Sequence, residues 1–240
     1  MLILAIDSTA KISTAALMRD GLLLGEITLG TGYTHSETLL PSVEFLLSAS
    51  KLKVSDVDIF ACASGPGSFT GVRIGTATIK GLAFGRGACC VPVGTLDALA
   101  ERAAEMRGIV VPVMDARRDQ VYTAVFDARD GIPKRLTADD AISVDELISM
   151  LPEHASDRPL YFVGDGYDLV HDRAAEKLHN VMETPLQMRD HAASAVASAA
   201  YRMLTTDGFA PISASELVPT YLRLSQAERE YNEKHKNDSI

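Results

Sequence analysis

The segment SGPGSFTGVRIG, from Ser64 to Gly75, constrains the fold of this chain more than any other stretch. It follows the apolar run VDIFACA at residues 57–63, which has the length of a buried strand, and it opens with a turn of glycine and proline. A helix expected over about residues 69–84 then carries three glycines: Gly71, Gly75 and Gly81. Together they would cost an isolated helix about 3 kcal/mol relative to alanine, so we expect a close neighbour that offsets this cost.

The expected helix is apolar over most of its circumference. At about 100° per residue, one stripe and its flank carry small or apolar residues, namely Gly71, Val72, Gly75, Thr78, Ile79, Leu82 and Ala83. The polar residues Arg73, Thr76 and Lys80 form only a narrow strip. Because one sheet cannot cover so wide an apolar surface, we expect two buried faces. Either the chain covers both faces itself, or one face meets another protein.

The composition excludes several classes of protein. A net charge of −9 opposes extensive direct contact with a nucleic-acid backbone. No apolar run approaches the roughly 18 residues that a membrane helix needs. The cysteines Cys62, Cys89 and Cys90 have no metal-ligand spacing. We therefore expect a cytoplasmic protein with no membrane segment.

A basic pair, Arg117 and Arg118, stands in a polar turn between two expected strands. Its ordinary interpretation is a solvated turn. Contact with a nucleic acid, or with a nucleotide at an interface, is the alternative that the sequence leaves open.

The order of apolar segments predicts an α/β chain. In the first half, the expected strands are residues 2–6, 12–18, 22–29, 57–63 and 87–93. Asp20-Gly21 is a hairpin signal between the second and third strands. Thr34 and Glu37 form a capping-box pattern that opens a helix ending near Ser50.

The pattern restarts in the second half. Expected strands are residues 109–114, 121–126 and 160–166, and expected helices are residues 144–151, 168–178 and 192–204. The two similar halves predict an N-terminal domain at residues 1–106 and a second domain at residues 107–240. The second ends in a polar tail from Ser225, for which we expect fraying.

Common catalytic motifs have no match in the sequence. No lysine stands where GxxxxGK[ST] requires it, and Gly65-Pro66-Gly67 begins a dinucleotide fingerprint in which Thr70 occupies the place of the third glycine. The six histidines supply no pair at the spacing of a metal-binding helix, and no serine lies in a GxSxG motif. We expect no catalytic residue, no metal and no cofactor.

Several motifs together resemble the TsaB family, also called YeaZ, the accessory proteins of bacterial tRNA threonylcarbamoyladenosine synthesis. They are IDST at the start, HSETLLP in the first helix, SGPGSFTGVRIG followed by KGLAFG, MDARRDQVY in the second half, and PTYLR near the end. The resemblance covers nearly the whole chain. It implies a two-domain actin-like, Hsp70-like and sugar-kinase-like (ASKHA) α/β fold, with mixed sheets flanked by helices.

The resemblance also implies a function. TsaB pairs with its catalytic paralogue TsaD and with the ATPase TsaE, and TsaD transfers threonylcarbamoyl to N6 of adenosine 37 in tRNAs that read ANN codons. TsaD carries an HxxxH pair on its first helix. The region of His35 has no second histidine, as expected of a non-catalytic member. The chain is then expected to activate TsaD, to contact tRNA only indirectly, and to form a homodimer when alone.

The family pairs through the first two helices, which correspond here to residues 35–50 and 69–85. We expect small residues to let a partner helix approach closely, and apolar residues to be buried beside it. The expected interface residues are His35, Leu39, Phe45, Phe69, Gly71, Val72, Gly75, Thr78, Ile79 and Leu82. A bulky residue at Gly75 is expected to block the partner more than it disturbs the monomer.

The turn Asp7-Ser8-Thr9 after the first strand supports a rival interpretation. Actin-like and sugar-kinase-like folds hold metal and phosphate there, although a plain strand-end turn explains the residues equally well. A nucleotide-dependent phosphotransferase of the same fold is therefore one alternative function. A self-associating structural protein is another, because the same helices could pair symmetrically.

Overall fold

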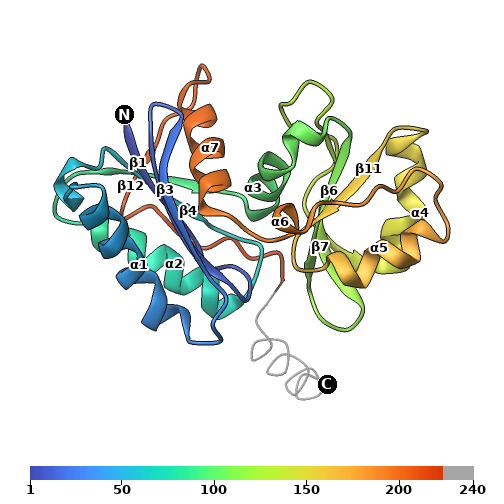
Figure 1. Cartoon of the computed structure of the whole chain (residues 1–240), viewed down its shortest axis with the longest axis horizontal. Coiled ribbons are helices and arrows are strands. Elements are labelled where there is room, and N and C mark those ends of the chain that lie inside the picture. Colours follow the sequence, from blue (N-terminus) through green and yellow to red (C-terminus); the bar gives the residue numbers. More distant parts are fainter. Residues whose placement is uncertain (224–240) are drawn as a thin grey trace, which may run out of the picture.

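The computed structural model describes residues 1–223 as two sheets with helices on their faces (Figure 1). The first sheet has the order β12-β5-β4-β1-β2-β3. Its strands are β1 (Leu2–Asp7), β2 (Ser13–Arg19), β3 (Leu22–Leu29), β4 (Ile59–Ala63), β5 (Cys89–Val93) and β12 (Ile212–Ser213). β1, β4 and β5 run parallel, whereas β2 and β3 are antiparallel, so the sheet is mixed. Asp20 and Gly21 form the predicted hairpin turn with φ of 51° and 81°.

Helices cover both faces of this sheet. Two lie side by side on one face, α1 (His35–Ala49) and α2 (Phe69–Ala83), while α7 (Ala193–Leu204) packs on the other (Figure 1). A helix in the middle of the molecule, α3 (Thr95–Arg102), packs between α7 and the second sheet. Short 3-10 turns lie at Val54–Asp56 and Ala104–Met106. No helix within residues 1–223 is long and apolar enough to cross a bilayer.

The second sheet is built around one long strand, β6 (Ile109–Asp115). Its other strands are β7 (Gln120–Thr123), β8 (Phe126–Asp127), β9 (Lys134–Arg135), β10 (Asp140–Ser143) and β11 (Leu160–Val163). Three helices accompany it, α4 (Val144–Ala155), α5 (Tyr167–Ala175) and α6 (Leu186–Arg189). Ser143 caps α4 by accepting a hydrogen bond of 3.2 Å from the Glu146 amide.

The strand expected over residues 121–126 is interrupted. β7 and β8 keep one register along β6, since Val113 pairs with Thr123 and Val110 with Phe126. Between them, the amide of Val125 donates to Thr137 Oγ1 at 2.9 Å and its carbonyl accepts from Leu136 at 2.8 Å. The backbone is thus diverted from β6 by a loop that the alternation of side chains does not reveal.

The predicted domain boundary needs a correction. The second half was expected to form one domain from residue 107 onward, but the chain returns to the first sheet after α6. α7 packs on β1, β2 and β4, and β12 pairs with β5. The apolar stripe of α7, with Val196 buried, matches the face of the first sheet that α1 and α2 leave open. The predicted tail from Ser225 lies outside the described residues.

The glycines of α2 explain how the helix meets the sheet. Gly71 and Gly75 are buried and face the turn after β1, where Ser8 donates a hydrogen bond of 2.9 Å to the Gly71 carbonyl. A Cβ on Gly71 would collide with the carbonyl oxygen of Ser8, and one on Gly75 would lie 2.6 Å from its Oγ. The close neighbour predicted for the helix is therefore the chain's own first strand. Gly81 is exposed and has open space around it.

Gly71→Ala and Gly81→Ala should change stability in opposite directions. The first forces α2 away from Ser8 and should lower the free energy of unfolding by about 2 kcal/mol, as overpacking does. The second adds helix propensity without a contact and should raise it by up to about 1 kcal/mol. Denaturant unfolding of both variants measures the difference. A Gly71→Ala protein as stable as Gly81→Ala would contradict the packing of α2.

Candidate functional site

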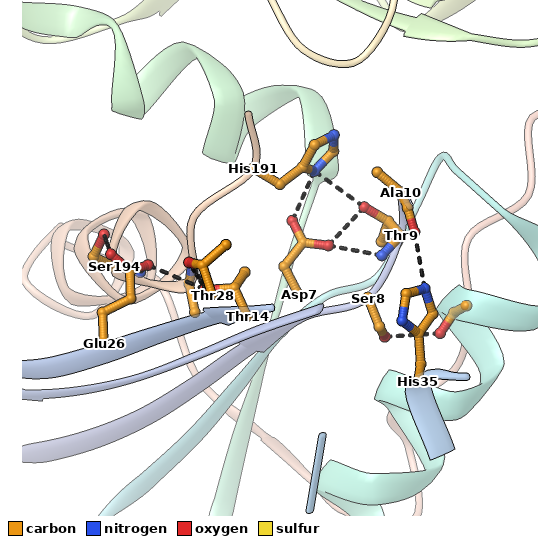
Figure 2. Close-up of polar contacts among 12 residues, drawn as sticks. Asp7, Ser8, Thr9, Ala10, Thr14, Glu26, Thr28, His35, His191 and Ser194 are labelled. Carbon is orange, nitrogen blue, oxygen red and sulfur yellow. Dashed lines mark hydrogen bonds and ion pairs between the residues drawn. The ribbon is translucent and has the colours of Figure 1, made fainter. Parts of the chain in front are cut away.

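The turn after β1 contains a buried ion pair. The carboxylate of Asp7 and the imidazole of His191 are 2% exposed or less, and His191 Nδ1 lies 3.0 Å from Asp7 Oδ2 (Figure 2). Thr9 donates to the other carboxylate oxygen twice, from its amide at 2.8 Å and its hydroxyl at 2.6 Å. His191 precedes α7, so the pair joins segments 184 residues apart in the sequence.

The two side chains shift each other's pKa in the directions that favour an ion pair. Burial by itself would raise the pKa of Asp7, but the positive charge and hydrogen bond of His191, with those of Thr9, hold the pKa below its ordinary value. Burial would lower the pKa of His191, and the carboxylates of Asp7, Asp165 and Asp190 outweigh this and raise that pKa. Each partner therefore favours the charged form of the other.

A cleft opens beside this turn. Two adjoining cavities of about 520 and 820 Å³ share the residues Ala10, Lys11, His35, Ser68, Thr70 and Asp165. The cleft lies between the turn after β1, the start of α2 and the turn after β11. Asp165 is exposed and lines this cleft, where partial desolvation raises the pKa of its carboxyl. The cleft is lined by both signs of charge.

Arg117 and Arg118 lie at the tip of the turn between β6 and β7. The backbone φ angles of Arg117, Arg118 and Asp119 are 66°, 56° and 58°. Residues other than glycine rarely adopt this left-handed conformation, and here three adopt it in succession. Arg117 lines the smaller cavity, its side chain is 80% exposed, and its guanidinium is 3.7 Å from Asp115. Arg118 is also exposed. Their contact with tRNA or a nucleotide stays a prediction.

Half of the ten residues predicted for the partner interface lie in the interior of the chain. The buried ones are Leu39, Gly71, Val72, Gly75 and Ile79. Because Gly71 and Gly75 face Ser8, the steric role expected for them toward a partner needs correction. A bulky residue at Gly75 would disturb the monomer first.

The remaining predicted interface residues are more accessible to differing degrees. His35 Nε2 lies 2.9 Å from the carbonyl oxygen of Ala10, and the ring of Phe69 stacks on Tyr221 at 4.7 Å. Thr78 and Leu82 are half-buried. Phe45 is 64% exposed. Of the ten residues predicted for the interface, Phe45 is therefore the one strongly exposed aromatic side chain.

Sequence reasoning missed three other residues: Phe84, Leu40 and His191. Phe84 at the end of α2 is 77% exposed, and Leu40 on α1 is 43% exposed. The motif KGLAFG included Phe84, and an outward helical position was its available signal. His191 had no such signal, because nothing in its local sequence indicates a contact with Asp7.

The Asp7 turn was proposed as a place for phosphate and metal, with Ser8 and Thr9. Ser8 is buried and donates to Gly71, and both carboxylate oxygens of Asp7 already have partners within the chain. Mg²⁺ requires near-octahedral oxygen ligands, whereas one carboxylate oxygen of Asp7 is bound by Thr9 and the other faces His191. In the described part of the chain, no group of three His, Cys, Asp or Glu side chains is arranged to hold a metal ion. The turn does not fit a divalent cation.

Comparisons with known proteins place the fold and family. The family model of TsaD, tRNA N6-adenosine threonylcarbamoyltransferase, matches residues 31–231. The chain is 31% identical to the tRNA threonylcarbamoyladenosine biosynthesis protein TsaB of Bacillus subtilis, over 98% of this chain and 100% of that protein. It is 37% identical to Escherichia coli TsaB over 52% of this chain and 55% of that protein. The structure of YeaZ from Pseudomonas aeruginosa superposes with a TM-score of 0.77 at 26% identity, covering 92% of this chain and 99% of that one.

Two flanked sheets with a cleft between them define a protein of the actin-like, ASKHA class, as the sequence predicted. Within that class, the chain belongs to the TsaB family, also called YeaZ. The resemblance stated from the sequence motifs is thereby confirmed.

The buried pair predicts a pH dependence of stability. Since the folded pKa of His191 is raised above its ordinary 6.5, its charge contributes stability that is complete below about pH 6.5 and is lost as the pH rises through the folded pKa. The advantage of the wild type over His191→Gln should therefore shrink as the pH rises above about 6.5 and through the folded pKa of His191. Asp7 affects stability at acidic pH. Because its pKa is lowered in the fold, its contribution to the free energy of unfolding is lost as the pH falls below its ordinary pKa of 3.8.

Unfolding free energies of both proteins across this range provide the measurement. An advantage that stays constant, or grows with pH, would show that His191 is neutral in the fold.

Proposed function

We propose that the chain is the non-catalytic partner that activates a TsaD-type transferase in forming N6-threonylcarbamoyladenosine at position 37 of tRNAs that read ANN codons. The proposal is supported by membership of the TsaB family, whose curated relatives are named for the biosynthesis of this nucleoside. The engaged state of the Asp7 turn favours a supporting role over phosphate chemistry. The acidic net charge favours indirect contact with tRNA.

The observation that carries the partner role is an exposed apolar surface on the paired helices. We name it the helix-pair surface, and it consists of Leu40, Phe45, Ala77, Gly81 and Phe84. On α2, Ala77 and Gly81 are four residues apart and share one face, and Phe84 follows at the C-cap of the helix. This face points away from the first sheet, because Gly71 and Gly75 hold the opposite side against Ser8.

The chemistry of this surface suits another helix. A Cβ placed on Gly81 would have no neighbouring atom within 4 Å. A partner's backbone can therefore approach α2 closely at Gly81, which is the role that the sequence predicted for Gly75. Exposed phenylalanines beside such a position are suited to insert into a partner's pockets, and buried aromatic side chains dominate the energy of many interfaces. The partner in this proposal is TsaD, and TsaE completes the complex by resemblance to the family. Without TsaD, the same surface supports a homodimer.

Phe45→Asp should weaken binding to the TsaD paralogue of the same organism at least tenfold, which corresponds to about 1.4 kcal/mol. A buried aromatic contact would be replaced by a charge without a partner. Titration calorimetry with the purified proteins measures the affinity, and reconstituted tRNA modification should fall in parallel at limiting concentrations.

Ile132→Asp is the matched control. Ile132 is 50% exposed, in the turn between β8 and β9 of the second sheet, so its substitution also places a charge at an exposed apolar position. Equal affinities of the two variants would refute the helix-pair surface as the binding site. Light scattering of the chain with and without TsaD tests self-association, since a dimer of this chain that persists with TsaD present favours a structural protein.

A further inference from the structure

The segment from Arg189 to Ser194 carries the chain from the second sheet back to the first. At its start, the Arg189 carbonyl accepts a hydrogen bond of 2.7 Å from Gly164, in the turn after β11. At its end, α7 begins on the first sheet. The segment therefore links the two walls of the cleft, and its attachments influence how the walls are held.

Three neighbouring strands hold this segment in succession (Figure 2). Asp7 at the end of β1 pairs with His191. On β2, Thr14 Oγ1 accepts a hydrogen bond of 3.2 Å from the Ala193 amide. On β3, Glu26 accepts from the amide and the hydroxyl of Ser194, both at 2.9 Å. Asp7 and Thr14 are directly paired in the ladder, so these attachments form a polar row across the sheet.

The ion pair is as deeply buried as Thr14 and more deeply buried than Glu26, which is half-buried. His191 is 2% exposed, and the acidic groups that act on it come from three places, Asp7 at the β1 turn, Asp165 at the β11 turn and its own neighbour Asp190. Thr9 Oγ1 lies 3.3 Å from the same ring nitrogen. The imidazole is thus enclosed among acidic groups that favour its protonated form.

We propose that the hydrogen-bonded pair of His191 and Asp7 fills the Asp7 turn in place of a metal ion and fastens the returning segment to the first sheet. The turn then serves as a latch between the two walls of the cleft. This role is independent of the partner-binding function proposed above.

A double-mutant cycle on the full chain tests the latch. His191→Gln and Asp7→Asn should each lower the denaturant midpoint, and the double variant should lower it by clearly less than the sum of the two shifts. The matched control is the pair His179 and Asp157, which lies 3.2 Å apart on the surface with side chains 79% and 95% exposed. His179→Gln with Asp157→Asn should give additive shifts. Additive shifts for the buried pair would overturn the latch.

Hydrogen exchange provides a local readout. The amides of Ala193 and Ser194 should exchange at least tenfold faster in His191→Gln than in the wild type, and at the wild-type rate in His179→Gln. Unchanged exchange in His191→Gln would mean that the segment is fastened without the pair.

A metal test uses the wild-type chain, so it does not depend on any variant folding. The probe is Mn²⁺, added to the protein free of affinity tags, and the readout is NMR line broadening. We expect the amide of Thr9 and the ring of His191 to keep their line widths up to millimolar Mn²⁺. Selective broadening of both, with loss of the His191 imidazolium signal, would show that a cation displaces His191 and would refute the proposal.

Discussion

The close approach of α2 to the turn after β1 is the contact on which this structure depends. It is possible only because Gly71 and Gly75 lack a side chain where the helix meets Ser8. The helix is thereby anchored on its glycine side, and Ala77, Gly81 and Phe84 are directed to solvent. Intramolecular packing thus selects which face of the helix remains available to a partner. The cost of two helical glycines is offset by this packing rather than by an interface.

The same turn connects the helix to the cleft. Ser8 faces α2, whereas Asp7 faces His191 on the segment that returns from the second sheet. Residues that suit metal and phosphate binding in folds of this class are here engaged by the protein itself. A phosphotransferase would need these groups free for its ligand, so the interior bonding of the turn favours the view that the chain works through its surface. The cleft nevertheless keeps charged walls, including Lys11 and Asp165.

Local signals in the sequence predicted much of the fold. Apolar runs predicted β1 to β5 of the first sheet. The Asp20-Gly21 turn predicted the hairpin between β2 and β3, and the capping box at Thr34 predicted the start of α1, because these signals act within a few residues. Local signals in the sequence could not predict contacts between distant segments. The return of α7 to the first sheet, the diversion at Val125 and the pairing of His191 with Asp7 each depend on residues that only the folded chain brings together.

The candidate interface shows the same division. Helical periodicity identified α2 as apolar on two sides, but it assigned the glycine stripe to a partner when the chain itself covers that side. Phe45 was found because it departs from the core stripe of α1. Phe84 lies where the helix ends, so its direction depends on the cap rather than on the periodicity. Periodicity predicts which side chains share a face, and packing decides what covers it.

Hydrogen exchange of this chain, with and without its TsaD paralogue, tests the central claim most directly. The account predicts that binding protects amides of α1 around Leu40 to Phe45 and of α2 from Ala77 to Phe84, while the exposed turn between β8 and β9 is unaffected. Protection confined to the cleft or to the second sheet, with α1 and α2 unchanged, would contradict it.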